Sequence, residues 1–174
     1  MPGRWAAASV RPVQIRQFTD ADWSQVWPIV RDVVRAADTF TYDPTMTAEQ
    51  SRATWVEQPP GLTVVAVEGD RVIGTAKMGP NRPGPGAHVS TASFMVASGA
   101  RGRGVGGSLC RFALDWARQQ GYAGMQFNAV AESNHAAVAL YRRLGFRVVG
   151  TVPGAFAHPT RGRVGLHVMY CPFG

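Results

Sequence analysis

The sequence predicts a single α/β domain in which a central mixed β-sheet carries helices on both faces. Seven short segments have the alternating or continuous apolar pattern of strands, and four longer ones repeat apolar residues at helical spacing. Their order along the chain is β-α-α-β-β-β-α-β-α-β-β. The chain has 174 residues, a usual size for one domain. We therefore expect one domain over residues 13–174, preceded by a flexible leader at residues 1–12.

The first half of the domain is expected to hold four strands and two helices. Asp20 is expected to cap the first helix, and Thr47 precedes a shorter helix that ends before Pro59. A Gly69-Asp70 turn joins two of the strands, because glycine supplies the positive φ that tight hairpin turns require. The expected strands are residues 13–17, 62–67, 71–78 and 88–96, and the expected helices are residues 20–36 and 47–57.

The second half begins with a loop of glycine and arginine that leads into a helix from Val105 to Gly121. Ser133 or Asn134 caps a further helix, which Gly145 ends. A strand, a glycine loop, a helix and another strand form a β-α-β unit, which is right-handed by the general rule. The remaining expected strands are residues 125–130, 146–152 and 164–170.

The charge balance of the chain indicates an anionic partner. The formal net charge is +7, and it comes almost entirely from arginine because Lys77 is the only lysine. The arginines are scattered from Arg4 to Arg163 instead of forming a basic tract interleaved with aromatic residues, a distribution that disfavours nucleic acid. A polyphosphorylated cofactor needs fewer charges and fits the sequence better.

Several other classes of protein are disfavoured by what the sequence lacks. Cys110 and Cys171 lie far apart without the spacing of a metal site or a redox motif, and the four histidines have no metal-ligand spacing either. We therefore expect no metal. No apolar run approaches the roughly 18 to 20 residues of a membrane helix, so a cytoplasmic protein without membrane contact is expected.

Residues 101–108, RGRGVGGS, lie where a strand ends and a helix begins. The first turn of a helix has unpaired N–H groups and a positive dipole end, and glycines let a phosphate approach the backbone. The segment is therefore a candidate anion site. It is not a P-loop, because Ser108 stands where that motif requires lysine.

The dinucleotide fingerprint GxGxxG is also present, at Gly102, Gly104 and Gly107, and Glu132 follows at the end of the next strand. An NAD-dependent oxidoreductase is thus an alternative. However, the 67 residues beyond Gly107 are too few for the remaining strands of a doubly wound sheet. The spacing RxxGxG, from Arg101 to Gly106, also accounts for the arginine.

Residues 96–106, VASGARGRGVG, resemble the acetyl-CoA signature of the GCN5-related N-acetyltransferases (GNAT family). A second element, Asn134, Ala137 and LYRRLGF at 140–146, is similar to that family's next motif, and it follows at a similar distance. The resemblance extends over roughly residues 13–170. Residues 40–44 and 152–156 are similar, less specifically, to the phosphinothricin-acetyltransferase-like branch.

The resemblance implies that acetyl-CoA is the cosubstrate. It places the pantetheine arm against the last residues of the 88–96 strand, where this strand splays from the strand at 125–130. It also places the pyrophosphate against the backbone amides of the glycine loop. The residues implied to bind the cofactor are Phe94, Met95, Val96, Arg101, Gly102, Arg103, Gly104, Val105, Gly106, Ser108 and Asn134.

Tyr141 is the candidate catalytic residue. When an amine attacks the thioester directly, coenzyme A leaves as a thiolate, which a positioned phenol can protonate. Tyr141 shares the inward face of its helix with Ala137 and Leu144, an arrangement that also suits ordinary core packing. A backbone N–H near Val96 is the implied donor to the developing oxyanion.

The sequence does not identify the general base. Many members of the family carry a glutamate on the strand that corresponds to 88–96, but this strand has no carboxylate here. His88, Glu132 and a water chain are the alternatives. The acceptor is expected to be a small primary amine or an amino-acid-like molecule, in a pocket lined by loops 38–47, 79–88 and 153–162. A homodimer is the assembly considered for the protein. A non-catalytic acyl-CoA-binding module is the remaining alternative.

Overall fold

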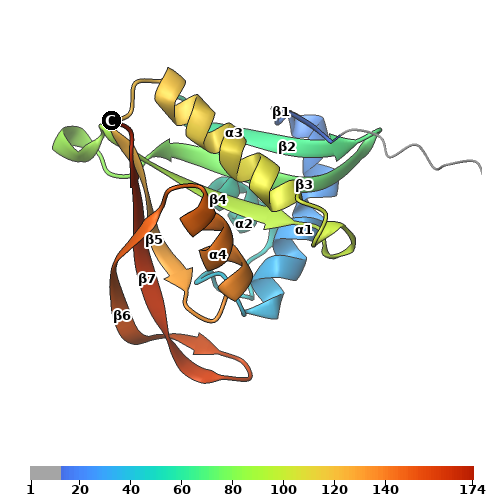
Figure 1. Cartoon of the computed structure of the whole chain (residues 1–174). Helices are drawn as coiled ribbons and strands as arrows, with labels where there is room; N and C mark the ends of the chain where they lie inside the picture. Colours follow the sequence, from blue (N-terminus) through green and yellow to red (C-terminus); the bar gives the residue numbers. More distant parts are fainter. Residues whose placement is uncertain (1–12) are drawn as a thin grey trace, which may run out of the picture.

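A computed structural model describes residues 13–174, which form one seven-stranded mixed sheet with four α-helices (Figure 1). All elements follow the order expected from the sequence. The strands lie in the order β1-β2-β3-β4-β5-β7-β6. Their bounds are β1 Gln14–Gln17, β2 Leu62–Glu68, β3 Arg71–Pro80, β4 Val89–Val96, β5 Gly124–Ala131, β6 Arg147–His158 and β7 Gly162–Pro172, and the helices are α1 Trp23–Ala36, α2 Ala48–Trp55, α3 Val105–Gln119 and α4 His135–Arg143.

The helices cover both faces of the sheet and bury one apolar core on each. Beneath α1 and α2, Val30 and Trp55 pack with Met95 of β4. Beneath α3 and α4, Leu109 packs in a core with Phe146. The inner strand β2 is buried along almost its whole length, because both of its faces are covered. The sheet with helices on both faces that the sequence predicts is therefore confirmed.

The tight turn between β2 and β3 is also as expected. Glu68 pairs with Arg71, so the turn consists of Gly69 and Asp70. The φ angle of Gly69 is 62°, in the left-handed region that favours glycine. Within residues 13–174 no helix is both long enough and apolar enough to span a bilayer.

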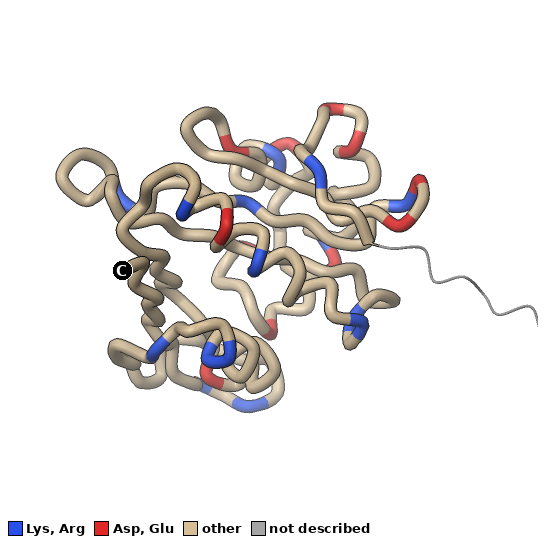
Figure 2. The backbone as a smooth tube through the Cα atoms, turned by 45° about the horizontal axis from the view of Figure 1, so that its top comes forward, with Lys and Arg blue, Asp and Glu red and all other residues tan. Residues whose placement is uncertain are grey.

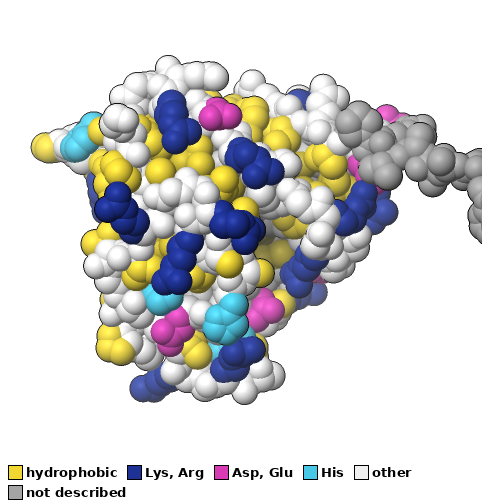
Figure 3. Space-filling model, viewed as in Figure 1, with side chains coloured by type: hydrophobic (Ala, Val, Ile, Leu, Met, Phe, Trp, Pro, Cys, Tyr) yellow, Lys and Arg dark blue, Asp and Glu magenta, His cyan; other side chains and the backbone are white. Residues whose placement is uncertain are grey.

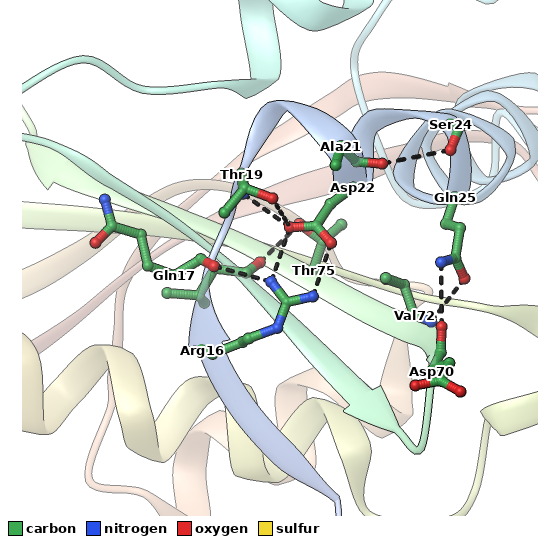
Figure 4. Close-up of polar contacts among 11 residues, drawn as sticks. Arg16, Gln17, Thr19, Ala21, Asp22, Ser24, Gln25, Asp70, Val72 and Thr75 are labelled. Carbon is green, nitrogen blue, oxygen red and sulfur yellow. Dashed lines mark hydrogen bonds and ion pairs between the residues drawn. The ribbon is translucent and has the colours of Figure 1, made fainter.

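The start of the first helical segment differs from the prediction. Thr19 caps a short 3₁₀ helix at Asp20–Asp22, and Asp22 is the N-cap of α1, so Asp20 caps neither helix. The N–H and hydroxyl of Thr19 both donate to the Asp22 carboxylate, at 2.8 and 3.0 Å. Arg16 of β1 donates to both carboxylate oxygens of Asp22, each at 2.8 Å (Figure 4). The Arg16–Asp22 pair therefore determines where the helix begins.

The hairpin of β6 and β7 is longer than predicted. Residues 153–162 were expected to form a loop, but β6 continues to His158 and leaves only a short turn before Gly162. The register shifts between Val152 and Phe156, and such a bulge accommodates Pro153 within a strand. Figure 1 shows the hairpin extending away from the body of the sheet.

Lys77, the chain's only lysine, links β3 to α2. Its Nζ donates to the Thr54 carbonyl at 2.7 Å and lies 3.2 Å from a carboxylate oxygen of Glu57. The ammonium also lies 6.0 Å from the centroid of the Trp55 ring. Lys77 thereby ties β3 to the end of α2 through its Nζ atom.

We predict that Asp22→Asn lowers the free energy of unfolding by about 2 kcal/mol at neutral pH. The Arg16 guanidinium lowers the pKa of Asp22 to about 2 by donating hydrogen bonds to the carboxylate, and bonds from Thr19 add to this effect. A carboxyl group with a lowered folded-state pKa stabilises the fold above its unfolded pKa. That stability is lost as the pH falls from about 4 to about 2. Urea unfolding measured across this range should show the wild type converging on the variant.

Asp20→Asn is the matched control, because Asp20 forms an exposed ion pair with Arg52 and such pairs contribute little. A difference between wild type and Asp22→Asn that stayed constant from pH 7 to pH 2 would contradict the assignment.

Candidate functional site

The site is built where β4 and β5 part. The two strands run parallel and pair only at Val89 with Gly124 and at Ser90 with Met125. Beyond these residues they diverge, and a cleft of about 930 Å³ opens between them. Residues from β4, β5, α4, the loop before α3 and the loop after α1 line this cleft. The splay expected at the end of the 88–96 strand is therefore present.

Alternation along β4 decides which backbone groups face the gap. The N–H of Ala97 donates to the Ile73 carbonyl on β3 at 2.9 Å, and successive residues of a strand direct their N–H groups to opposite edges. The N–H groups of Phe94 and Val96 therefore face β5, which does not pair with them. The backbone of Met95 faces β3 instead. Phe94 and Val96 thus form an open strand edge inside the cleft.

The glycine loop presents an anion site to the same cleft. Gly102 and Gly104 have φ angles of 74° and 81°, and a Cβ added to either would meet no atom within 4 Å. The N–H of Arg101 donates to the Ser98 carbonyl at 3.4 Å, and the next residue along the chain whose N–H bonds to a backbone carbonyl is Ser108, which donates to Gly104 at 3.0 Å. Within the described chain, the N–H groups of Val105 and Gly106 have no backbone acceptor. They lie at the positive end of the α3 dipole.

Two residues expected to bind the cofactor turn away from the cleft. The Arg103 guanidinium pairs with Glu68, and the Ser108 hydroxyl donates to the Gly104 carbonyl at 3.2 Å. Conversely, Arg111 and Arg143 line the cleft although the sequence analysis did not select them. Helical spacing could have found Arg111, which lies one turn beyond the glycine loop on the same helix.

Asn134 caps α4. Its side-chain oxygen accepts a hydrogen bond from the N–H of Ala137 at 3.2 Å. Asn134 also lines the cleft, and no protein acceptor for its amide NH₂ group is present among residues 13–174. The cap therefore leaves this donor available at the cleft.

Tyr141 lies in an aromatic cluster at the point where the strands part. Its ring centroid is 4.6 Å from that of Phe127, 5.9 Å from Phe146 and 6.3 Å from Phe94. Burial raises the pKa of the Tyr141 phenol above its usual value, with a smaller contribution from Cys110. The hydroxyl has no hydrogen-bond partner in the described part of the chain, and Tyr141 lines the cleft. It therefore stays protonated near neutral pH and has an uncommitted donor.

The residues considered as general bases lie elsewhere. The Nδ1 atom of His88 is 3.0 Å from the Pro85 carbonyl, and a carboxylate oxygen of Glu132 accepts the Gly165 N–H at 2.5 Å. Neither residue lines the cleft. Of the three loops expected around the acceptor, only that after α1 contributes, through residues 38–42. The loops at 79–88 and 153–162 lie outside the lining.

Comparison with known proteins identifies the family. Residues 27–146 match the model of the acetyltransferase (GNAT) family. The chain belongs to this family. The match favours acetyl transfer from acetyl-CoA over the dinucleotide-binding alternative.

The solved structure of a GCN5-related N-acetyltransferase from Kribbella flavida is 55% identical, with a TM-score of 0.90 over 92% of this chain and 98% of that one. The L-methionine sulfoximine/L-methionine sulfone acetyltransferase of Pseudomonas paraeruginosa is 30% identical over 80% of this chain and 83% of that protein. A phosphinothricin acetyltransferase from Sinorhizobium meliloti has the same fold, with a TM-score of 0.80 at 24% identity over 93% of this chain and 89% of that one.

Other curated relatives are much longer than the region that matches. The chain spans 13% of the length of one yeast protein and 40% of another. The family is thus shown by the shared domain, whereas the acceptor has to be argued from the site.

We predict that Gly104→Asp weakens acetyl-CoA binding by at least about tenfold, because a carboxylate beside the glycine loop repels a polyphosphate. The matched control is Gly121→Asp. Gly121 has the same φ of 81° and equally open surroundings, but it lies at the other end of α3. Both variants should lose similar stability from the strained backbone.

The measurement is the rise in melting temperature caused by acetyl-CoA. It should persist in Gly121→Asp and shrink in Gly104→Asp, and NAD should cause none. Equal acetyl-CoA affinity in the two variants would mean that the loop is only a structural entry to the helix.

Proposed function

We propose that the protein transfers an acetyl group from acetyl-CoA to the primary amine of a small molecule by direct attack, with Tyr141 as general acid. The observation that carries this proposal is the convergence of three features on one cleft. They are the open N–H groups at the start of α3, the unpaired edge of β4 and the free hydroxyl of Tyr141.

The chain's groups fit acetyl-CoA, which supplies the acetyl group as an activated thioester. The pyrophosphate would be held by the backbone N–H groups between Gly102 and Gly106, where glycines leave room for it. The amides of the pantetheine arm would pair with Phe94 and Val96 as an added strand. The NH₂ group of Asn134 is a further donor beside this edge.

Tyr141 would donate its proton to the sulfur of coenzyme A as the bond between carbon and sulfur breaks. Its raised pKa keeps the phenol protonated in the resting enzyme, but it also makes the phenol a weaker acid, so the transfer depends on close contact with the sulfur as charge develops there. The N–H of Val96 faces the gap and would donate to the oxygen of the acetyl carbonyl as negative charge develops there. Both donors lie on rigid elements, α4 and β4.

A small, amino-acid-like amine is the acceptor that the comparisons favour. The relative from Pseudomonas paraeruginosa, matched over most of its length, is named for acetylating L-methionine sulfoximine and L-methionine sulfone. The cleft also has polar side chains on the side that the acetyl-CoA groups leave free, including Thr91, Ser93 and Asn128.

The test is a panel of primary amines incubated with acetyl-CoA, in which free thiol and acetylated product are both measured. Small amino-acid-like amines should release thiol in step with product. A protein that binds acetyl-CoA but acetylates no member of the panel would instead be a non-catalytic acyl-CoA-binding module.

We predict that Tyr141→Phe lowers kcat by roughly 10²- to 10⁴-fold, because general acid catalysis contributes that much. The substitution keeps the ring and its aromatic contacts, so the KM for acetyl-CoA and the melting temperature should change little. Steady-state kinetics and thermal unfolding of one variant provide both readouts. Full activity of Tyr141→Phe would mean that water protonates the thiolate, and lost stability with retained kcat would mean that the hydroxyl only supports the fold.

A further inference from the structure

Charge is divided unequally between the two halves of the chain. Nine of the 11 acidic residues precede Arg71, whereas 12 of the 18 basic residues stand at or after it. Figure 2 shows this distribution along the backbone. In Figure 3, Lys and Arg side chains are spread over the face that carries α3 and α4, among few acidic ones. The glycine loop therefore lies on a basic face, whereas α1 and α2 belong to the acidic half of the chain.

The two sides of the cleft also differ in the parts of the chain that form them. Met95 packs in the core beneath α1 and α2, and Phe94 contacts the core beneath α3 and α4. Because side chains alternate along a strand, Thr91 and Ser93 point to the same face as Met95. The loop after α1, residues 38–42, lines the cleft from this face. The side opposite the glycine loop therefore combines Thr91 and Ser93 of β4 with the loop after α1, and only this loop belongs to the acidic half of the chain.

Asp38 is the only carboxylate among the described residues that line the cleft. Its Oδ1 atom is buried and has no hydrogen-bond partner within residues 13–174. Other acidic residues nearby in sequence are paired, as Asp22 is with Arg16 and Asp32 is with Arg31. The cationic residues of the lining come from the loop before α3, from α3 and from α4, and none forms an ion pair with Asp38.

We propose that Asp38 binds the acceptor amine as an ammonium ion and takes up the proton that it loses before attack. This proposal rests on the proposed acetyl transfer and names its acceptor-side residue. It also supplies the carboxylate that β4 lacks. The acceptor class that follows is a primary amine that is cationic at neutral pH, bound among hydroxyl and amide groups.

The energetics of the Asp38 side chain point to a ligand. A buried carboxylate oxygen without a donor is unfavourable for folding. If the Asp38 side chain turned toward the cleft, an ammonium nitrogen there could give this oxygen a charge-assisted hydrogen bond. The acceptor would therefore gain this interaction on entering the cleft. Acetyl-CoA, with its negative phosphates, would be directed to the opposite, basic face.

The proton balance of the step is complete. The ammonium gives one proton to the Asp38 carboxylate, and the neutral amine attacks the acetyl carbon. A carbon–nitrogen bond forms, the carbon–sulfur bond breaks, and the sulfur receives the proton of Tyr141. The nitrogen then loses a second proton, which restores the Tyr141 phenol through solvent, and Asp38 releases its proton to water. The products are the amide, coenzyme A and one proton.

The test compares Asp38→Asn with Asp43→Asn, using the amine from the panel that the wild type acetylates fastest. Asp43 lies in the same loop, but its carboxylate accepts hydrogen bonds from Thr45 and does not line the cleft. Asp38→Asn should lower kcat/KM for the amine by at least roughly 10- to 100-fold, the loss expected for a hydrogen bond to a charged group, and loss of the proton acceptor should lower kcat further. The KM for acetyl-CoA should be unchanged, and Asp43→Asn should match the wild type in kcat/KM.

Thermal unfolding separates binding from a structural role. Asp38→Asn should melt at the same temperature as the wild type or higher, because Oδ1 has no hydrogen bond to lose. The alcohol analogue of the amine, which has no ammonium group, should inhibit the wild type only weakly. In Asp38→Asn, the inhibition constant of the alcohol should be similar to the dissociation constant of the amine. Asp38→Glu should recover part of the lost kcat/KM.

Two outcomes would overturn the proposal: kcat/KM in Asp38→Asn within twofold of the wild type, or a loss of activity that accompanies a lower melting temperature. If the wild type acetylates no amine, the proposed function fails first, and the assignment of Asp38 fails with it. The wild-type panel thus tests the proposed reaction, and the ratio of kcat/KM in Asp38→Asn to kcat/KM in the wild type tests the role of Asp38.

Discussion

The parting of two parallel strands is the constraint on which the rest of the structure depends. If β4 and β5 paired along their whole length, the backbone groups of Phe94 and Val96 would be satisfied and no cleft would exist. Their separation would leave polar groups unpaired in the middle of the sheet, which is tolerable only where something else can bond to them. Aromatic rings from both strands and from α4 fill the apolar part of the gap. The fold thus keeps an open strand edge without exposing a core.

The same separation opens a path from one face of the sheet to the other. The α3 dipole and the glycine loop lie on one side, and the loop after α1 lies on the opposite side. The two reactants can therefore approach from different faces and meet at the gap beside Tyr141. This geometry needs no covalent intermediate, and Cys110, the thiol nearest in sequence to the glycine loop, is fully buried.

Local patterns predicted the elements and their order, because apolar periodicity and glycine positions depend on neighbouring residues alone. These local patterns gave wrong predictions where contacts with residues distant in sequence determine the structure. Thr19 and Asp20 are both good capping residues, and the choice depends on Arg16 of β1, which binds Asp22. Pro153 favours a loop locally, but pairing with β7 across a bulge keeps it in a strand. Asp38 carries no motif, and only the folded chain brings it to the cleft.

An enzyme that handles a reactive thioester exposes its own amines to acetylation. The free base is the form that reacts, so an ammonium held in an ion pair is a poor target. The only lysine, Lys77, is paired with Glu57 and bonded to the Thr54 carbonyl. Arginine, which carries nearly all the positive charge, stays protonated and does not compete as a nucleophile. The choice of arginine over lysine therefore attracts a polyphosphate donor and leaves Lys77 as the only side-chain amine of the chain.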